Sequence, residues 1–363
     1  MTTILLGPQR FTTTVGATVR ALGVDGPVAM VNSGWEERES DDAELAGHLD
    51  GRGVNLRLYR RAFELLRAEP QLRTVVLDHR SRHDELRAFY GLRLQSAWDT
   101  VFAVRHRTSR HGIGEGAERS ALQALRDVDD WYAYEVAQLV EQTAATDAFR
   151  GSAALATQRA EIAELLASSA AVVVAGGHVG LLMETLRLFA VSVPATTPVV
   201  AWSAGAMAVC DPVVLFHDFA PHGITAPEVH DRGLGRVRGV VPLPHARRRL
   251  ALDDRDRMAV FAARFPAHRL VPLDAGTVVR LGSTDADGRA VLPEGTRVLT
   301  TAGTVVSEIA TPKSRNVSMS RPTCPPATTT ASEAASSSAI SARWVASASL
   351  LLNTSVAAVC STS

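Results

Sequence analysis

The stretch that most constrains the fold is 171–218, where two apolar runs each end in a turn of small residues. Ala171–Ala175 stops at Gly176-Gly177, an amphipathic segment follows, and Pro198–Trp202 then runs into Ser203. Strand, turn, helix, strand, tight turn and helix in this order predict an α/β fold with a doubly wound, mostly parallel sheet. Sites in such sheets lie at the carboxyl ends of strands, so we expect the site at these two turns.

Ser203 stands where a nucleophile elbow places a reactive hydroxyl, at a sharp turn from a strand into a helix. Ala204 and Gly205 are small enough to allow that turn. We expect the N–H of Ala204, and the N–H of Gly177 at the end of the neighbouring strand, to form an oxyanion hole. The elbow pattern G-x-S-x-G is only partly met, because Ala201 replaces its first glycine.

A nucleophilic serine needs a base, and the base needs a carboxylate to orient it. Asp218 follows the short apolar run Pro212–Phe216, and His245 follows Val240–Pro244. Taken singly, Asp218 is better explained as a loop cap and His245 as a surface histidine. Together with the elbow, they predict a triad of Ser203, His245 and Asp218.

These segments resemble the dipeptidase E and cyanophycinase family of serine peptidases, whose fold is like the class I glutamine amidotransferase domain. The resemblance covers 170–311 well and 1–79 loosely, and it rests on Ala175–His178, Trp202–Ala206, Asp218, Gly233–Gly235, Pro244-His245 and Leu273–Thr277. It implies Ser203 as the nucleophile, His245 as the general base and Asp218 as its partner.

The resemblance further implies cleavage of a peptide or amide bond in a small aspartyl or β-aspartyl substrate. It implies substrate-binding roles for Gly176, His178 and Asp274. The sequence departs from the family pattern at His178, where a polar amide or acid is more frequent, and at Asp274, where Glu is frequent. These departures bear on substrate preference more than on the type of reaction.

Composition excludes several other classes of function. The formal net charge is zero over 363 residues, so no basic field draws nucleic acid or anionic lipid. Three cysteines without C-x-x-C spacing argue against a zinc site or a disulfide framework, and Cys210 is expected to be buried packing. We expect no metal, cofactor or membrane partner, and, because the N-terminus has no signal-peptide pattern, a cytoplasmic protein.

Residues 80–168 carry apolar side chains at helical spacing and predict a helical insertion in the α/β domain. Three helices are expected, over 84–107, 118–149 and 152–168, and Thr74–Leu77 before them is read as a short strand. The insertion has no counterpart in the minimal family fold. We interpret it as a lid or as the element through which the chain forms a homo-oligomer.

The predicted α/β domain spans 1–312 and closes with a hairpin over Arg297–Ala310 that turns at Gly303. From 313 to 363, Ser, Thr, Ala and Pro dominate. Such a composition buries too little apolar surface to offset the entropy of ordering, so we expect a disordered tail.

Three alternative functions stay open at this stage. A catalytically idle amidotransferase-like domain that binds a partner is compatible with Ala201 and His178. An esterase would use the same three residues on a different bond. A glutamine amidotransferase is less favoured, because that reaction uses a cysteine at the elbow, where this chain has Ser203.

Overall fold

The computed structural model describes residues 1–220 and 225–308. The chain divides into one compact unit, Met1–Thr311, and a second unit, Pro312–Ser363. The predicted tail and the last residues of the predicted closing hairpin lie outside the described residues. The following account concerns the first unit.

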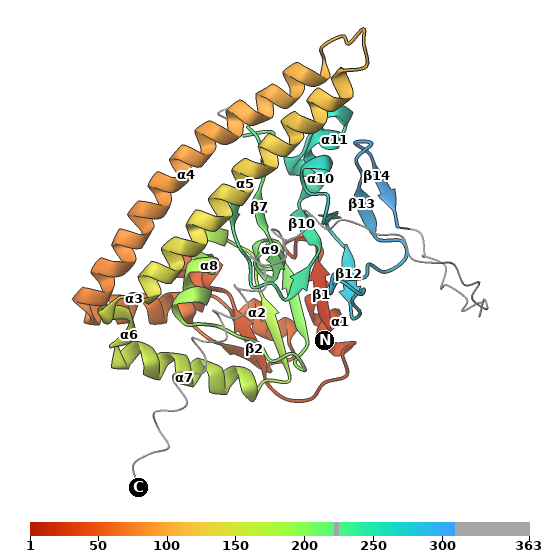
Figure 1. The fold of residues 1–363 in the computed structure, drawn as a ribbon. Helices are drawn as coiled ribbons and strands as arrows, with labels where there is room; N and C mark the ends of the chain where they lie inside the picture. The colour runs from red at the N-terminus through yellow and green to blue at the C-terminus, as the bar shows by residue number, and fades with distance from the viewer. Residues whose placement is uncertain (221–224, 309–363) are drawn as a thin grey trace, which may run out of the picture. The chain divides into compact units, whose positions relative to one another are not determined.

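A six-stranded sheet lies at the centre of this unit, and its strand order is β12-β1-β5-β4-β2-β3 (Figure 1). The strands are β1 (Thr3–Leu6), β2 (Val28–Val31), β3 (Gly53–Asn55), β4 (Ala171–Val174), β5 (Val199–Trp202) and β12 (Val278–Leu281). All neighbours pair in parallel except β12, which is antiparallel to β1 at one edge. The prediction of a mostly parallel α/β sheet is therefore confirmed.

Helices cover both faces of this sheet, because successive side chains of a buried strand point to opposite faces. On β1, Ile4 and Leu6 pack with α1 (Val15–Arg20) and α2 (Ala43–His48). The intervening Leu5 belongs to the larger core on the other face. That face is covered by α3 (Leu58–Ala68), α7 (Ala153–Ala167) and α8 (Val179–Leu188).

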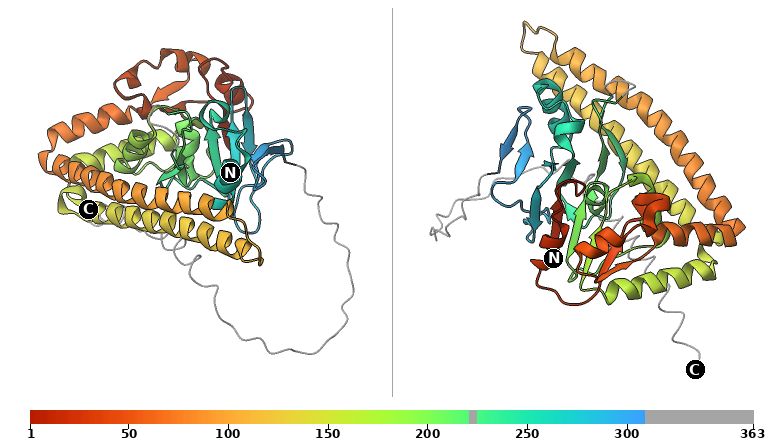
Figure 2. Two further views of the ribbon diagram at one scale, coloured as in Figure 1. Left: turned by 90° about the horizontal axis from the view of Figure 1, so that it is seen from above. Right: turned by 180° about the vertical axis from the view of Figure 1, so that it is seen from behind.

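Residues 70–144 form a long antiparallel hairpin of two helices, α4 (Pro70–Arg105) and α5 (Gly114–Ala144), which lie side by side in both views of Figure 2. The short α6 (Asp147–Arg150) then leads into α7. The predicted strand at Thr74–Leu77 is wrong, because α4 already begins at Pro70. Proline is well suited to a first helical position, where the N–H it lacks would have no acceptor within the helix.

The hairpin is tied to the rest of the unit through a buried ion pair. Arg264 of α11 (Arg255–Arg264) is fully buried and donates to both carboxylate oxygens of Asp129 on α5, at 2.6 and 2.5 Å. It also donates to the hydroxyl of Tyr90 on α4, at 3.0 Å. A charge that is paired and fully hydrogen-bonded in this way is tolerated in a core.

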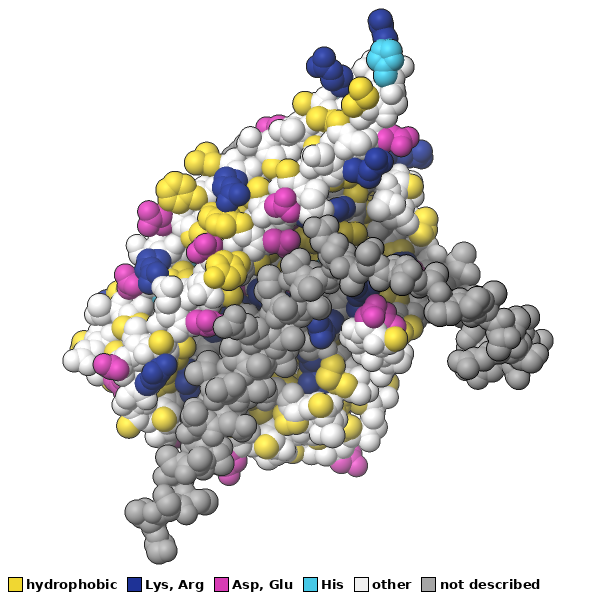
Figure 3. Space-filling model, viewed as in Figure 1, with side chains coloured by type: hydrophobic (Ala, Val, Ile, Leu, Met, Phe, Trp, Pro, Cys, Tyr) yellow, Lys and Arg dark blue, Asp and Glu magenta, His cyan; other side chains and the backbone are white. Residues whose placement is uncertain are grey.

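The outer surface of the hairpin is mixed in character (Figure 3). Basic and acidic side chains are interspersed along it, with hydrophobic side chains between them. Phe89 and Leu92, both on α4, are 57% and 73% exposed. The predicted role of this element in oligomerisation stays a prediction.

A second sheet of four strands follows in the order β10-β11-β13-β14, a division into two sheets that was not predicted. Its strands are β10 (Val240–Pro244), β11 (Arg269–Leu273), β13 (Arg297–Leu299) and β14 (Val305–Ser307). The strands β10 and β11 are parallel, and β13 and β14 form the expected hairpin around Gly303. The carboxyl ends of β10 and β11 therefore meet at one edge.

The remaining elements are short segments between these strands and helices. They are η1 (Ser33–Ser40), α9 (Ala204–Val209), β6 (Cys210–Asp211), β7 (Val213–Leu215), β8 (Glu228–Asp231), β9 (Val237–Arg238) and α10 (Ala246–Arg249). Strand β6 pairs with β9, and β7 pairs with β8. Within the two described ranges, no helix is long and apolar enough to span a bilayer.

Candidate active site

A pocket of about 970 Å³ lies where several parallel strands end. It is lined by residues that directly follow β1, β2, β4, β5 and β10, among them Gln9, Arg10, Gly34, Trp35, Gly176, Gly177, Ser203, Ala204 and His245. Polar groups from different segments converge there because parallel strands present their carboxyl ends at the same edge. The predicted location of the site at the turns after 175 and 202 therefore coincides with a large pocket.

Ser203 directly follows β5 and has φ 50° and ψ −122°. A non-glycine residue with positive φ is strained, and such strain gathers at functional sites. Its side chain lies against Gly176, since a Cβ built on that glycine would be 2.8 Å from the Cβ of Ser203 and 3.5 Å from its Oγ. The serine is half-buried and lines the pocket. This is the geometry of a strand–turn–helix elbow.

Glycine at 205 and alanine at 201 are both explained by packing. A Cβ on Gly205 would lie 2.1 Å from the carbonyl oxygen of Val174, so α9 can approach β4 this closely only with glycine there. Ala201 is fully buried within β5, and its methyl group belongs to the core on one face of the sheet. The missing elbow glycine therefore does not prevent the turn.

The loop after β4 is held against the loop after β2. The N–H of His178 donates to the carbonyl of Gly34 at 2.7 Å. Gly177 has φ 119°, and a Cβ on it would lie 2.1 Å from the same oxygen of Gly34. This position therefore requires glycine both for its backbone angle and for space.

Two backbone N–H groups beside Ser203 are left without acceptors. Within residues 1–220 and 225–308, the N–H of Gly177 and the N–H of Ala204 donate to no protein group. Both residues line the pocket. Ala204 is the first residue of α9, and the first N–H groups of a helix have no partner inside it. Free donors beside a serine hydroxyl are what an oxyanion hole requires.

His245 follows β10 in the left-handed conformation, with φ 57°. Its N–H donates to the carbonyl of Leu273 at 3.0 Å, which fixes it beside the end of β11. Its ring lines the pocket with Ser203 and makes no hydrogen bond to any residue that the structure describes. Partial burial and the positive charges of Arg249 and Arg248 lower the pKa of His245 below 6.5, and Asp274 opposes this shift. At neutral pH the ring is therefore uncharged and can accept a proton.

Asp274 is a carboxylate whose charge acts on His245. It directly follows β11, whose last residue pairs with the last residue of β10. Its Oδ1 accepts the N–H of Arg247 at 3.0 Å, while its Oδ2 is buried without a hydrogen bond. Arg247 and Arg297 lie 3.6 and 3.7 Å from that oxygen, which is too far for a hydrogen bond. One buried oxygen of this carboxylate therefore has no hydrogen-bond donor among the described residues.

Asp218 was predicted to hold the imidazole, but its carboxylate is engaged elsewhere. It is buried, and its Oδ1 accepts from Arg257 at 2.5 Å in an ion pair that is also buried. Its Oδ2 accepts the N–H of Ala251 at 2.9 Å. With both oxygens used in this way and no contact to His245, the carboxylate cannot orient the ring in this arrangement. Its catalytic role stays a prediction that these contacts do not favour.

The predicted substrate-binding residues divide into two groups. Gly176 lines the pocket, whereas His178 and Asp274 do not. His178 instead caps α8, where its Nδ1 accepts the N–H of Leu181 at 3.1 Å. A capping role of this kind explains the residue locally. Contact of His178 or Asp274 with substrate stays a prediction.

Several pocket residues escaped the sequence reasoning. Arg249 of α10 is exposed, lines the pocket and has no ion-pair partner among the residues described. Arg10, after β1, also lines it. Arg87 of the hairpin and Glu228 of β8 form an ion pair at 2.8 Å on the pocket wall. Nothing local in the sequence indicated that Arg249 or residue 87 reaches this site.

Two competing kinds of site find no support in the described part of the chain. No group of His, Cys, Asp or Glu there is arranged to hold a metal ion. Cys210 is fully buried, and burial raises the pKa of its thiol, so the thiolate needed for nucleophilic attack is disfavoured. Burial of Cys210 agrees with its predicted role in packing.

No protein-family model matches the chain, and no curated protein matches it in sequence. Among solved structures, the crystal structure of a peptidase from an acI-B1 actinobacterium is similar to 59% of this chain and 89% of its own, at 18% identity and a TM-score of 0.26. At that score the likeness carries no argument about activity.

Proposed function

We propose that this chain is a serine hydrolase that cleaves a peptide or amide bond in a small substrate through an acyl-enzyme. The observation that carries the proposal is the conformation of Ser203, a non-glycine residue at φ 50° at the carboxyl end of β5. The same pocket contains His245, which is uncharged at neutral pH, and two backbone N–H groups that have no acceptor among the described residues. A strained serine, a base and an oxyanion site are the parts that acyl transfer requires.

In the proposed reaction, Oγ of Ser203 attacks the substrate carbonyl carbon while its proton passes to the ring of His245. The N–H groups of Gly177 and Ala204 hold the oxygen that becomes negative. The intermediate then collapses, the bond to nitrogen breaks, and His245 returns its proton to the leaving amine. Water repeats the sequence on the acyl-enzyme and frees the acid and Ser203. One such backbone donor contributes about 100- to 1,000-fold in rate.

We assign the carboxylate of the triad to Asp274 instead of Asp218. The support is the position of Asp274 at the end of the strand next to β10, its open Oδ2 and its favourable charge interaction with His245. A carboxylate in that place stabilises the imidazolium that forms during attack. The absence of a hydrogen bond between Ser203 and His245 in the free protein is no obstacle, because catalytic hydrogen bonds often tighten only when substrate binds.

The charges of the pocket favour a substrate with a negative group near the bond to be cut. Arg249 has no ion-pair partner among the residues described, and it lies on the same wall as His245. A guanidinium holds a carboxylate through two parallel hydrogen bonds. This supports the aspartyl and β-aspartyl substrates that the family resemblance implies.

The test is a panel of small substrates offered to the purified wild-type chain and to Ser203→Ala. It contains aspartyl and β-aspartyl dipeptides, the matched asparaginyl and alanyl dipeptides, and a simple nitrophenyl ester. Release of amine from the acidic dipeptides, absent in the variant, supports the proposal. Cleavage of the ester alone would indicate an esterase, and turnover of nothing on the panel would favour the catalytically idle domain.

A further inference from the structure

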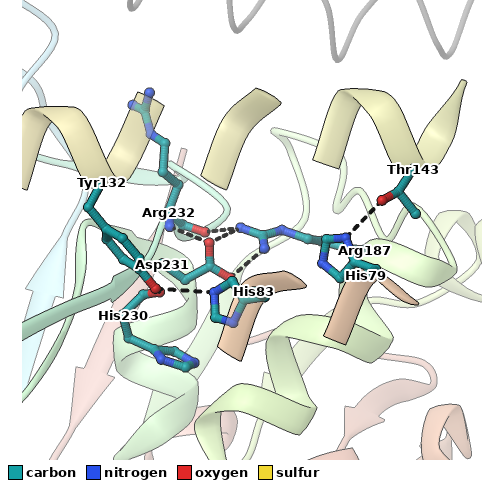
Figure 4. A network of polar contacts seen from close by, with 8 residues as sticks. All are labelled: His79, His83, Tyr132, Thr143, Arg187, His230, Asp231 and Arg232. Atoms are coloured by element: carbon teal, nitrogen blue, oxygen red, sulfur yellow. Dashed lines mark hydrogen bonds and ion pairs between the residues drawn. The ribbon is translucent and has the colours of Figure 1, made fainter. Parts of the chain in front are cut away.

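Three histidines, His79, His83 and His230, gather at the base of the helical hairpin (Figure 4). His79 and His83 lie one turn apart on α4, with ring centroids 6.3 Å apart and nearly parallel planes. The ring of His230 on β8 meets that of His83 edge-on at 5.8 Å. The cluster therefore joins α4 of the hairpin to β8, the strand whose residue Glu228 lines the pocket.

Hydrogen bonds in the cluster define where its protons lie. The hydroxyl of Tyr132 on α5 donates to the carbonyl of His230 at 3.1 Å. Its oxygen can then only accept from His83, so Nε2 of His83, at 3.2 Å, carries the hydrogen. His79 shares a hydrogen bond of 2.8 Å with Thr143, also on α5. Nδ1 of His230 is buried without a partner.

The charged side chains that act on the three rings come from α4, α8 and β8. On α4 these are Arg80, Asp84 and Arg87, on α8 they are Glu184 and Arg187, and on β8 they are Glu228 and Asp231. The acids on α8 and β8 are already paired, Asp231 with both outer nitrogens of Arg187, Glu184 with Arg80 and Glu228 with Arg87. Asp84 is exposed on the solvent side. A proton added to the cluster therefore meets no unpaired buried carboxylate.

The cluster is also connected to the pocket. Arg87 comes one helical turn after His83, and its Nη2 donates to Glu228 at 2.8 Å, where both residues line the pocket. On the other side, Nε2 of His230 and the ring of His178 both lie 3.2 Å from the point where a Cβ on Gly180 would sit. His178 belongs to the loop of Gly177. Movement at the base of the hairpin would thus reach two walls of the site.

We propose that His79, His83 and His230 form a pH-sensitive latch, which docks the base of the hairpin while the rings are neutral and releases it when they are protonated. Release withdraws Arg87 from Glu228 and opens the pocket wall on that side. As regulation of the Ser203 pocket the inference rests on the proposed function, whereas the latch itself does not depend on catalysis.

The direction of the pH dependence follows from burial. Burial lowers the pKa of all three histidines below 6.5, and it lowers that of His230 to about 4. A histidine released into water has its ordinary value of 6.5, so the released form binds more protons between these two values. The docked state is therefore most stable above pH 6.5, where the latch is closed, and its stability decreases as the pH falls from 6.5 toward 4.

Hydrogen–deuterium exchange read by mass spectrometry tests the latch without any need for activity. The Ser203→Ala chain is labelled at about pH 7.5 and about pH 5, with labelling times scaled to the intrinsic exchange rate. Peptides from 72–90 and 135–144 are expected to exchange on the order of tenfold faster at the lower pH, because each pKa unit that the released form regains shifts the equilibrium tenfold. Peptides from β4 and β5 are the control for global unfolding. They are expected to keep their protection at both pH values.

Variants make the test specific. His79→Gln, His83→Gln and His230→Gln combined are expected to abolish the pH response, and His83→Gln alone to reduce it if the triple variant does not fold. His106→Gln is the matched control, because His106 lies exposed in the loop at the other end of the hairpin. A hairpin base that exchanges equally at both pH values, or a pH response that is undiminished in His83→Gln, would overturn the latch. Either outcome leaves the proposed hydrolase untouched.

Discussion

Gly176 and Ser203 are packed so closely that a Cβ on the glycine would lie 2.8 Å from the Cβ of the serine. Real Cβ atoms do not approach each other this closely, so the backbone or the side chain of Ser203 would have to move. We expect Gly176→Ala to displace Oγ and to reduce kcat by at least about 100-fold, since a misplacement of about 1 Å costs that much. Gly47→Ala, where a Cβ meets nothing within 4 Å, is the matched control and is expected to keep full activity.

The Asp274→Asn and Asp218→Asn variants are expected to have different defects, the first in catalysis and the second in stability. Asp274→Asn removes the charge beside His245 and should lower kcat at least about 100-fold with little loss of stability. Asp218→Asn leaves Arg257 buried without its counter-ion and should cost about 3–5 kcal/mol of unfolding free energy.

Chemical denaturation and steady-state kinetics on both variants separate these effects. A folded Asp218→Asn enzyme that is stable but inactive, next to an active Asp274→Asn, would restore Asp218 as the orienting carboxylate. The reverse pattern supports the assignment drawn from the structure.

The activity of the wild-type chain is expected to fall on the acid side through the titration of His245. Burial and the charges of Arg249 and Arg248 lower its pKa, so the neutral form that accepts the serine proton persists below pH 6.5. The acid limb of kcat/KM should therefore have its midpoint below 6.5. A midpoint clearly above that value would mean that a different group is the base.

Arg249 and Arg248 form a matched pair for testing substrate recognition. Both lower the pKa of His245, but only Arg249 lines the pocket. Arg249→Gln and Arg248→Gln should each move the acid limb to higher pH. Only Arg249→Gln should also raise KM for an acidic dipeptide, by on the order of tenfold, as expected when one charged hydrogen-bonding partner is lost. Equal KM values in the two variants would remove Arg249 from substrate binding.

The central sheet could be predicted because its strands have a clear local sequence pattern. Ala171–Val174 and Val199–Trp202 are buried on both faces, so each is a continuous apolar run that ends at a turn of small residues. Ser203 and the N–H groups around it could be located for the same reason, since they follow directly from the ends of those strands.

The carboxylate that we propose as the partner of His245 could not be predicted from local patterns. Which acid follows the strand next to β10 depends on the pairing of β10 with β11, a long-range register that spacing along the chain does not reveal. Asp218 follows an apolar run just as Asp274 does, yet it packs against α11 through Arg257. Similarly, Thr74–Leu77 is too short a run to distinguish strand from helix, and the helical pattern that continues to Arg105 decides it.

The most direct measurement for the central claim is labelling with a fluorophosphonate, followed by intact-mass analysis of the wild-type chain, Ser203→Ala and His245→Ala. An activated serine beside an oxyanion hole attacks this reagent, whereas an ordinary serine does not. We predict one adduct on the wild-type chain, located at Ser203, and none on either variant. A folded wild-type chain that stays unlabelled, or an adduct that persists in Ser203→Ala, would contradict the assignment of Ser203 as the nucleophile.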